Sequence, residues 1–236
     1  MKIALVGYGK MGREIERLAV GRGDTIVSVF DIDTLPTPEG LAEAEVCIDF
    51  SVPKAVVHNI KTAADAGVDM VVGTTGWYEH LGEVRKWFDS SGLVYSQNFS
   101  IGANLFYRIV RHAAQLVGPI GEYDVFVAEE HHREKVDSPS GTALRLGEIL
   151  LETLGSKSRI VTDLGPGAMA PDALHVSAVR AGSIAGVHRV GFDSEADTIE
   201  LRHVARSRTG FALGALAAAR WVRGRRGVFT MDDVEL

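Results

Sequence analysis

The sequence has one cysteine and no long hydrophobic run, and these two shortages exclude several kinds of protein. Cys47 by itself cannot form an intramolecular disulfide or a multi-cysteine metal site, and its position in the apolar residues 46–48 predicts a buried thiol. No apolar stretch approaches the roughly 20 residues of a membrane-spanning helix. Residues 1–6 lead directly into a glycine turn, without a signal peptide. We therefore expect a cytoplasmic protein without a membrane partner.

The sequence also lacks an excess of positive charge. Lysine and arginine number 25 against 31 aspartates and glutamates, which gives a net charge of -6. A nucleic-acid-binding surface is basic, because it must displace counterions. The one basic cluster, which lies at residues 220–226, is typical of a solvated helix end. We expect no nucleic-acid partner.

The first hundred residues alternate between short apolar runs and segments with helical spacing. Residues 3–6 lead into glycine, and residues 11–20 repeat apolar side chains at helical spacing. Further apolar runs lie at residues 25–30, 46–48, 70–72 and 93–95, with predicted helices at 53–66 and 78–88. Continuous apolar strands separated by helices indicate a parallel sheet covered on both faces. This part predicts an α/β fold of the Rossmann type, with a doubly wound parallel sheet.

The pattern changes after residue 100 and predicts a second, α+β domain with an open mixed sheet. Predicted helices lie at residues 103–117 and 142–154, and predicted strands lie at 124–128, 175–180, 185–192 and 198–205. Glycine and acidic turns separate the last three strands, so we expect them to pair consecutively and antiparallel. An alanine-rich helix at 210–221 should return to the first domain. The expected domains are residues 1–101 with 211–236, which bind a dinucleotide, and residues 102–210, which bind substrate and form the oligomer.

The turn Gly7-Tyr8-Gly9-Lys10-Met11-Gly12 is a G-x-G-x-x-G that follows a predicted strand and opens a predicted helix. The glycines allow a tight turn and a close approach of backbone to a pyrophosphate, and the helix N-terminus favours an anion. Glycines in such turns can also serve geometry alone. The placement favours dinucleotide binding.

Two further turns are expected at the same edge of the sheet. Asp31 ends the second strand, where a carboxylate would accept hydrogen bonds from the adenosine ribose and repel a 2′-phosphate; the alternative is an ordinary loop aspartate. Lys10 could still attract that phosphate, so the sequence favours NADH over NADPH without excluding NADPH. Gly73-Thr74-Thr75-Gly76 closes another strand and should also face the cofactor.

Residues 129–143 carry the densest group of ionisable side chains in the chain. His131 and His132 are adjacent, Lys135 follows, and Ser140-Gly141-Thr142 has the composition of a helix N-terminus that could bind a carboxylate. Histidine suits proton transfer near neutral pH, and lysine could supply charge or a proton. Metal binding is the rival interpretation, but adjacent residues on a strand point to opposite faces and no further ligand set accompanies them. We expect catalysis and no metal.

The same residues resemble the signature of the dihydrodipicolinate reductase family, usually written E-A-H-H-x-x-K-x-D-A-P-S-G-T-A. The resemblance continues in order along nearly the whole chain. The matching segments are Asp49-Phe50-Ser51, Gly73-Thr74-Thr75-Gly76, Asn98-Phe99-Ser100-x-Gly102, Val179-Arg180-Ala181-Gly182, Gly186-x-His188, Ser207-Arg208 and Phe211-Ala212.

This resemblance implies an NADH- or NADPH-dependent reduction of a small dicarboxylate in lysine and diaminopimelate biosynthesis. It implies that His131 is the general acid or base and that Lys135 donates a proton. His132 and the turn Ser140-Gly141-Thr142 would bind the substrate. Cofactor contacts are expected from the glycine turn, from Asp31 and from these matching residues: Phe50, Gly73, Thr74, Thr75, Ser96, Gln97, Asn98 and Phe99.

The resemblance also implies a homotetramer assembled through the sheet of the second domain, with hinges near Ser100 and Phe211. The sequence departs from the family pattern in three ways. Glu130 replaces an alanine. Glu134 stands where a basic or polar residue is common, and it could pair with Lys135. The segment before Asp49 is short, which trims the loop on the adenosine side.

Two other functions fit part of the sequence. A related dehydrogenase of a small amino acid such as aspartate would keep the glycine turn but has little use for residues 131–142. A protein that senses NAD without catalysis would tolerate the loss of His131 or Lys135. The presence of both side chains in the expected places favours the reductase.

Overall fold

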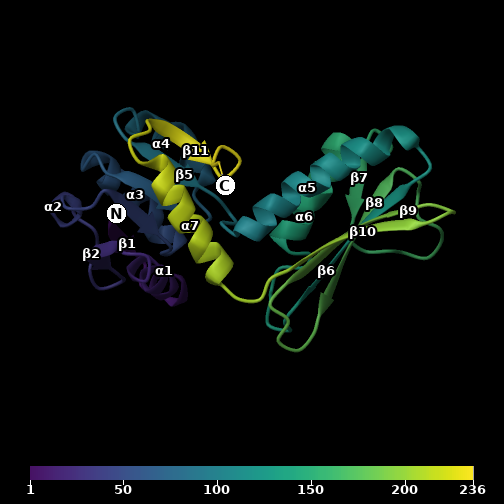
Figure 1. Cartoon of the computed structure of the whole chain (residues 1–236), viewed down its shortest axis with the longest axis horizontal. Helices are drawn as coiled ribbons and strands as arrows, with labels where there is room; N and C mark the ends of the chain where they lie inside the picture. Colours follow the sequence, from purple (N-terminus) through teal and green to yellow (C-terminus); the bar gives the residue numbers. More distant parts are fainter. Residues whose placement is uncertain (236) are drawn as a thin grey trace. The chain divides into compact units, whose positions relative to one another are not determined.

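The chain forms two compact units, and the computed structural model describes residues 1–235 (Figure 1). The first unit contains Met1–Ile101 and residues 208–235, and the second contains Gly102–Ser207. The chain thus leaves the first unit once and returns to it. Among the described residues, no helix is both long enough and apolar enough to cross a membrane.

The first unit contains a six-stranded sheet in which every pair of neighbouring strands is parallel. In spatial order the strands are β2 (Thr25–Phe30), β1 (Lys2–Val6), β3 (Val46–Asp49), β4 (Asp69–Val72), β5 (Gly92–Tyr95) and β11 (Gly227–Thr230). The predicted Rossmann-type sheet is confirmed. Strand β11 was not predicted; it lies at the edge beside β5, and such a short segment becomes a strand only because that edge is available to pair with it.

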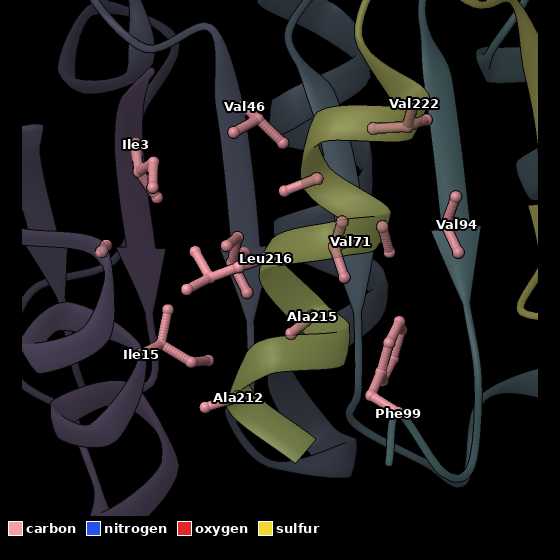
Figure 2. Packing of buried hydrophobic residues seen from close by; sticks show 14 of the residues in the cluster. Ile3, Ile15, Val46, Val71, Val94, Phe99, Ala212, Ala215, Leu216 and Val222 are labelled. Atoms are coloured by element: carbon pink, nitrogen blue, oxygen red, sulfur yellow. The ribbon is translucent and has the colours of Figure 1, made fainter. Parts of the chain in front are cut away.

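Helices cover both faces of this sheet, because its strands are apolar on both sides. Helices α1 (Lys10–Val20) and α7 (Thr209–Val222) pack on Ile3, Val46 and Val71 (Figure 2). The alternate strand residues, Cys47 among them, pack against the helices of the other face, which are α3 (Pro53–Asp65) and α4 (Leu81–Trp87). The short elements α2 (Pro38–Leu41) and η1 (Tyr78–His80) complete the unit. Cys47 is fully buried as predicted, and burial raises the pKa of its thiol.

The second unit is a mixed five-stranded sheet with helices on one face. In spatial order the strands are β10 (Thr198–Val204), β9 (Val187–Asp193), β6 (Asp124–His131), β8 (Ala173–Arg180) and β7 (Arg159–Val161). Helices α5 (Ile101–Val117) and α6 (Gly141–Thr153) pack on its apolar face, and the short η2 (Gly118–Ile120) follows α5. The predicted α+β unit with a mixed sheet is confirmed.

One pairing prediction for this sheet was wrong. Strands β9 and β10 pair antiparallel as expected, but β8 does not pair with β9. Strand β6 lies between them, parallel to β8 and antiparallel to β9. Its side chains are buried at every second position, including Val125 and Val127. A strand that buries this apolar row is most stable at the centre of the sheet, so it separates two strands that are neighbours in sequence.

Candidate active site

The strand ends of the first unit bring the predicted cofactor residues to one edge of the sheet. The amide of Gly7 donates to the carbonyl of Phe30 at 2.9 Å, so the glycine turn lies beside the residue that precedes Asp31. Across the sheet, the amide of Phe50 donates to Val6 and that of Gly73 to Asp49, at 2.9 and 2.8 Å. Parallel sheets bind ligands beyond the carboxyl ends of their strands, where the strand order reverses.

The glycines of the turn have different physical roles. A Cβ on Gly7, which has a φ of 88°, would lie 2.4 Å from the carbonyl oxygen of Phe50. A Cβ on Gly12 would lie 2.4 Å from the oxygen of Gly7, whereas one on Gly9 would meet no atom within 4 Å. Gly9 caps α1, and no side chain bonds the amides there. Open space beside uncapped amides of a helix N-terminus fits an anionic phosphate.

The side chains within this turn are held in different ways. Tyr8 donates a hydrogen bond to Glu16, which raises the pKa of the Tyr8 phenol, and the guanidinium of Arg13 lies 4.7 Å from the Tyr8 ring centroid. Met11 packs against the core. Lys10 is exposed at the first position of α1. Tyr8 and Met11 therefore shape the turn, and the ammonium of Lys10 faces solvent.

A buried carboxylate behind the strand ends was not recognised from the sequence. Asp49 accepts hydrogen bonds from the amide and hydroxyl of Ser51, from Asn59 and, at 2.6 Å, from Thr74. Burial raises the pKa of Asp49 in spite of these donors. The side chain of Thr74 therefore points inward, and Thr75 is the exposed threonine of its turn. The signal in the sequence was an acidic residue that ends an apolar strand.

Asp31 and the segment after β5 complete this edge. Oδ1 of Asp31 accepts from the amides of Asp33 and Thr34, at 3.0 and 3.2 Å, so the carboxylate also organises its own loop. Ser96 exchanges hydrogen bonds with the backbone of Asn98, and Gln97 is exposed. Phe99 is only 1% exposed and packs edge-on against Phe50, with the ring centroids 5.9 Å apart. Phe99 thus belongs to the core and offers its backbone alone.

In the second unit, strand pairing gathers residues that are far apart in sequence on the helix-covered face of the sheet. Glu129 lies opposite His188, and His188 lies opposite His203. His131, two residues beyond Glu129 on the same face, lies opposite Arg180. The sheet therefore brings together Glu129 and His131 of β6, Arg180 of β8, and the histidines of β9 and β10.

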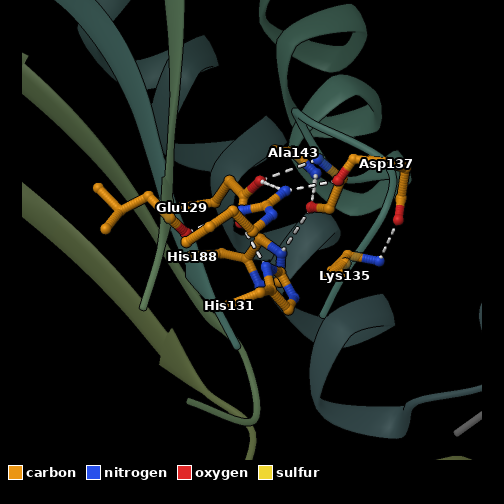
Figure 3. Close-up of polar contacts among 9 residues, drawn as sticks. Glu129, His131, Lys135, Asp137, Ala143 and His188 are labelled. Carbon is orange, nitrogen blue, oxygen red and sulfur yellow. Dashed lines mark hydrogen bonds and ion pairs between the residues drawn. The ribbon is translucent and has the colours of Figure 1, made fainter. Parts of the chain in front are cut away.

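Glu129 is at the centre of this group (Figure 3). It has no exposed surface, and its Oε2 accepts a hydrogen bond from Nδ1 of His131. Its Oε1 accepts from the amide of Ser140 at 2.9 Å and from Nη2 of Arg180 at 2.7 Å. Burial alone would raise the pKa of Glu129, but these hydrogen bonds outweigh it and lower the pKa to about 2. The carboxylate is therefore ionised at neutral pH.

Two further histidines, His188 and His203, lie beside this group. The rings of His131 and His188 meet edge to face at 5.3 Å, and those of His188 and His203 stack at 6.0 Å. Burial, followed by the nearby His131 and His203, lowers the pKa of His188 to about 3. Burial also lowers the pKa of His203. Both imidazoles are uncharged at neutral pH, so they supply polarity without positive charge.

The loop after β6 holds the remaining predicted residues. His132 is half-buried, and its carbonyl accepts from the amide of Lys135 at 3.1 Å. The ammonium of Lys135 donates to Asp137 at 2.7 Å, so its partner is this aspartate and not the neighbouring Glu134. Lys135 thus lies with His132 on the short loop that follows His131 and leads into α6.

The start of α6 divides the predicted substrate-binding turn into inner and outer parts. Ser140 is 2% exposed; its hydroxyl accepts from the amide of Ala143 at 3.3 Å and contacts Nε2 of His188 at 3.3 Å. Gly141 is exposed and Thr142 is half-exposed. Ser140 therefore fixes the helix cap, while Gly141 and Thr142 form the accessible side of the turn. Among residues 1–235, no three histidine, cysteine or acidic side chains are grouped as metal ligands.

Comparison with known proteins identifies the family. Family models described as the N-terminus and the C-terminus of dihydrodipicolinate reductase match residues 1–99 and 102–234. The chain belongs to the dihydrodipicolinate reductase family. The 4-hydroxy-tetrahydrodipicolinate reductase of Christiangramia forsetii is 38% identical, and the match covers 99% of this chain and 97% of that protein. The enzyme of the same name from Methanococcoides burtonii is 35% identical, and the match covers 95% of this chain and 85% of that protein.

A solved structure supports the same fold. Dipicolinate-bound dihydrodipicolinate reductase from Paenisporosarcina sp. TG-14 superposes with a TM-score of 0.80 over 99% of both chains, at 24% identity. Membership of this reductase family confirms the resemblance carried by residues 129–143, and it favours the reductase over the amino-acid dehydrogenase and the NAD sensor.

Proposed function

We propose that this member of the family catalyses the NADH- or NADPH-dependent reduction of 4-hydroxy-tetrahydrodipicolinate, or dihydrodipicolinate, to tetrahydrodipicolinate in lysine and diaminopimelate biosynthesis. The observation that carries the proposal is the group around His131. A buried, ionised carboxylate holds its Nδ1, and Lys135 lies on the adjoining loop. An imidazole held by a carboxylate is suited to moving a proton during reduction of a ring.

The cofactor would bind along the strand ends of the first unit. Gly7, Gly9 and Gly12 leave room for a pyrophosphate at the uncapped start of α1. Phe50, the turn at residues 73–75 and the segment at 96–99 would contact the rest of the dinucleotide, Phe99 through its backbone. When bound, the dinucleotide supplies the hydride.

NADH is the proposed preferred cofactor. Asp31 follows β2 directly beside the glycine turn, and its Oδ1 is held by two amides of its own loop. That fixed carboxylate would accept hydrogen bonds from the adenosine ribose and repel a 2′-phosphate. The exposed Lys10 is the nearby cation that could favour NADPH, so both cofactors belong in the assay.

The substrate would bind in the second unit. His131 would act as general acid or base through Nε2, because Nδ1 is held by Glu129. Lys135 would donate a proton or stabilise negative charge, and His132 would bind one carboxylate. The N-terminus of α6, with Gly141 and Thr142 on its accessible side, would bind a carboxylate through amides and hydroxyl. Ser140 would act by holding that turn in place.

A homotetramer built on the second sheet, in the cytoplasm, completes the proposal. Helices α5 and α6 pack on one face of this sheet (Figure 1), and the strand register puts exposed Val179 and Val204 and half-buried Phe126 on the other face. Apolar side chains on an open sheet face favour association. The single cysteine accords with a reducing compartment.

The test is a coupled assay with purified protein. Dihydrodipicolinate synthase makes the substrate from pyruvate and aspartate semialdehyde, and absorbance follows the oxidation of NADH and, separately, NADPH. We expect turnover with at least one cofactor and its loss in a folded His131→Ala variant. Measurable NADH binding without oxidation of either cofactor would contradict the proposal.

A further inference from the structure

Glu129 is a buried carboxylate whose two oxygens both have donors. Oε2 contacts the ring of His131, and Oε1 accepts from the amide of Ser140 and from Arg180. The three partners come from β6, the start of α6 and β8. A carboxylate that accepts hydrogen bonds from three elements cannot rotate without breaking some of those hydrogen bonds. The direction in which Oε2 points is therefore fixed.

We propose that Glu129 is a positioning residue that fixes the Nδ1-protonated tautomer of His131 and leaves Nε2 free for proton transfer. This inference rests on the proposed function of His131. An ionised carboxylate has no proton to donate, so the ring nitrogen that contacts it must carry one. In the neutral imidazole the other nitrogen is then the acceptor. The low pKa of Glu129 keeps the carboxylate in the ionised form at neutral pH.

Gly186 lies beside Nε2 of His131. Gly186 approaches it so closely that a Cβ on the glycine would lie 3.0 Å from Nε2. The φ of Gly186 is 151°, a backbone conformation that other residues rarely adopt. Because position 186 is a glycine, no side chain there blocks access to Nε2 of His131.

Arg180 supplies the positive charge that Glu129 needs in the interior. Its Nη2 also donates to the carbonyl of Asp137 at 2.6 Å. Arg180 therefore joins the carboxylate that orients His131 to the loop that carries Lys135. This partly buried ion pair thus holds the carboxylate beside His131 and also contacts the loop of Lys135.

The first test needs no variant. The full chain is labelled with ¹⁵N-histidine, and long-range ¹H–¹⁵N spectra are recorded at about pH 8.5, where an ordinary histidine is neutral. A folded His131→Asn protein identifies the His131 signals by their loss. We expect Nδ1 of His131 to carry the proton and Nε2 to be bare. A proton on Nε2 in the native protein would overturn the proposal.

The second test removes the negative charge of Glu129. In Glu129→Gln the side-chain amide can donate as well as accept, so both tautomers of His131 become accessible. We expect a mixed tautomer, a kcat at least about 100-fold lower and a substrate KM within about threefold of the native value. Glu122→Gln is the matched control, because Glu122 is an exposed glutamate of the same unit. It should leave the kcat and the tautomer unchanged.

The outcomes separate this proposal from the proposed function. A native tautomer and a native kcat in Glu129→Gln would refute the positioning role. A native protein that never oxidises NADH or NADPH would refute the proposed function, while its spectra would still decide the tautomer. If Glu129→Gln does not fold, the spectra of the native chain decide alone.

Discussion

Lys135 donates a hydrogen bond to Asp137, with 2.7 Å between its Nζ and Oδ1 of that carboxylate. Burial raises the pKa of Asp137, but the hydrogen bonds, led by that of Lys135, outweigh it and lower the pKa. An exposed carboxylate thus holds the ammonium of Lys135, which is proposed to donate a proton or to stabilise negative charge.

Removing the exposed carboxylate of Asp137 should strengthen substrate binding. In Asp137→Asn, Lys135 loses a competing partner, and an exposed ion pair is worth about 0.2–1 kcal/mol. We expect the substrate KM to fall by up to about fivefold, with a smaller change in kcat. Initial rates at saturating NADH measure both, and Asp163→Asn, an exposed change in the same unit, controls for lost charge. A higher KM in Asp137→Asn would contradict the idea of competition.

Substitutions of the base and of the helix turn should affect different kinetic constants. His131→Ala removes the proposed acid or base and should lower kcat by about 100-fold or more. Thr142→Val removes a hydroxyl from the start of α6 and should mainly raise the substrate KM. The coupled assay gives both constants for each protein. Equal loss of substrate affinity in both variants, with turnover intact, would contradict the assigned roles.

Substitutions of two glycines in the cofactor turn should have different effects, one mainly on stability and the other mainly on NADH binding. Gly12→Ala forces a Cβ to within 2.4 Å of the Gly7 carbonyl oxygen, so we expect a loss of about 1–3 kcal/mol in unfolding free energy. Gly9→Ala meets no atom within 4 Å and should change stability by about 1 kcal/mol or less. The added methyl group would nevertheless occupy the proposed pyrophosphate site and raise the Kd for NADH at least about tenfold.

Tryptophan fluorescence can follow this unfolding, because Trp77, Trp87 and Trp221 all belong to the first unit. Calorimetry measures the affinity for NADH. Undiminished NADH binding by Gly9→Ala would place the pyrophosphate elsewhere.

Asp31 should set the preference between cofactors. Asp31→Ser removes the carboxylate proposed to bind the ribose hydroxyls and to repel a 2′-phosphate. We expect kcat/KM for NADH to fall more than that for NADPH, so that their ratio shifts by about tenfold. Asp33→Ser, at a neighbouring exposed acid, serves as the control. An unchanged ratio in Asp31→Ser would remove Asp31 from this role.

The second unit should lose stability as the pH falls. The pKa of His188 is about 3 in the fold against an ordinary 6.5, so between these values the unfolded chain takes up a proton that the folded chain refuses. Glu129, with a pKa of about 2 against 4.5, acts in the same direction at lower pH. Each such proton lowers the unfolding free energy by up to about 1.4 kcal/mol per pH unit.

Urea titrations at pH values between about 7 and 4.5 would measure this slope. NMR signals from β6 must report it, since the tryptophans lie in the first unit. His188→Asn should make the slope shallower. The same slope in both proteins would show that His188 is not the group responsible.

The sequence by itself determined the parts of this protein that depend on local order. Alternating apolar runs and helical spacing predicted the parallel sheet, because each strand must bury both of its faces. The glycine turn and residues 129–143 are contiguous, so their spacing could be read directly and compared with a family. The predicted strand ended at residue 128, however, so the shared face of Glu129 and His131 followed only from the extension of β6 to His131.

Only the tertiary structure decided which distant residues meet. Nothing in the local sequence pattern places β6 between β8 and β9, yet that position brings His188 beside Glu129 and Arg180 beside His131. The partner of Lys135 also proved to be Asp137 and not Glu134. Such contacts depend on strand order and register, which are set by the burial of whole faces and not by neighbours in the chain.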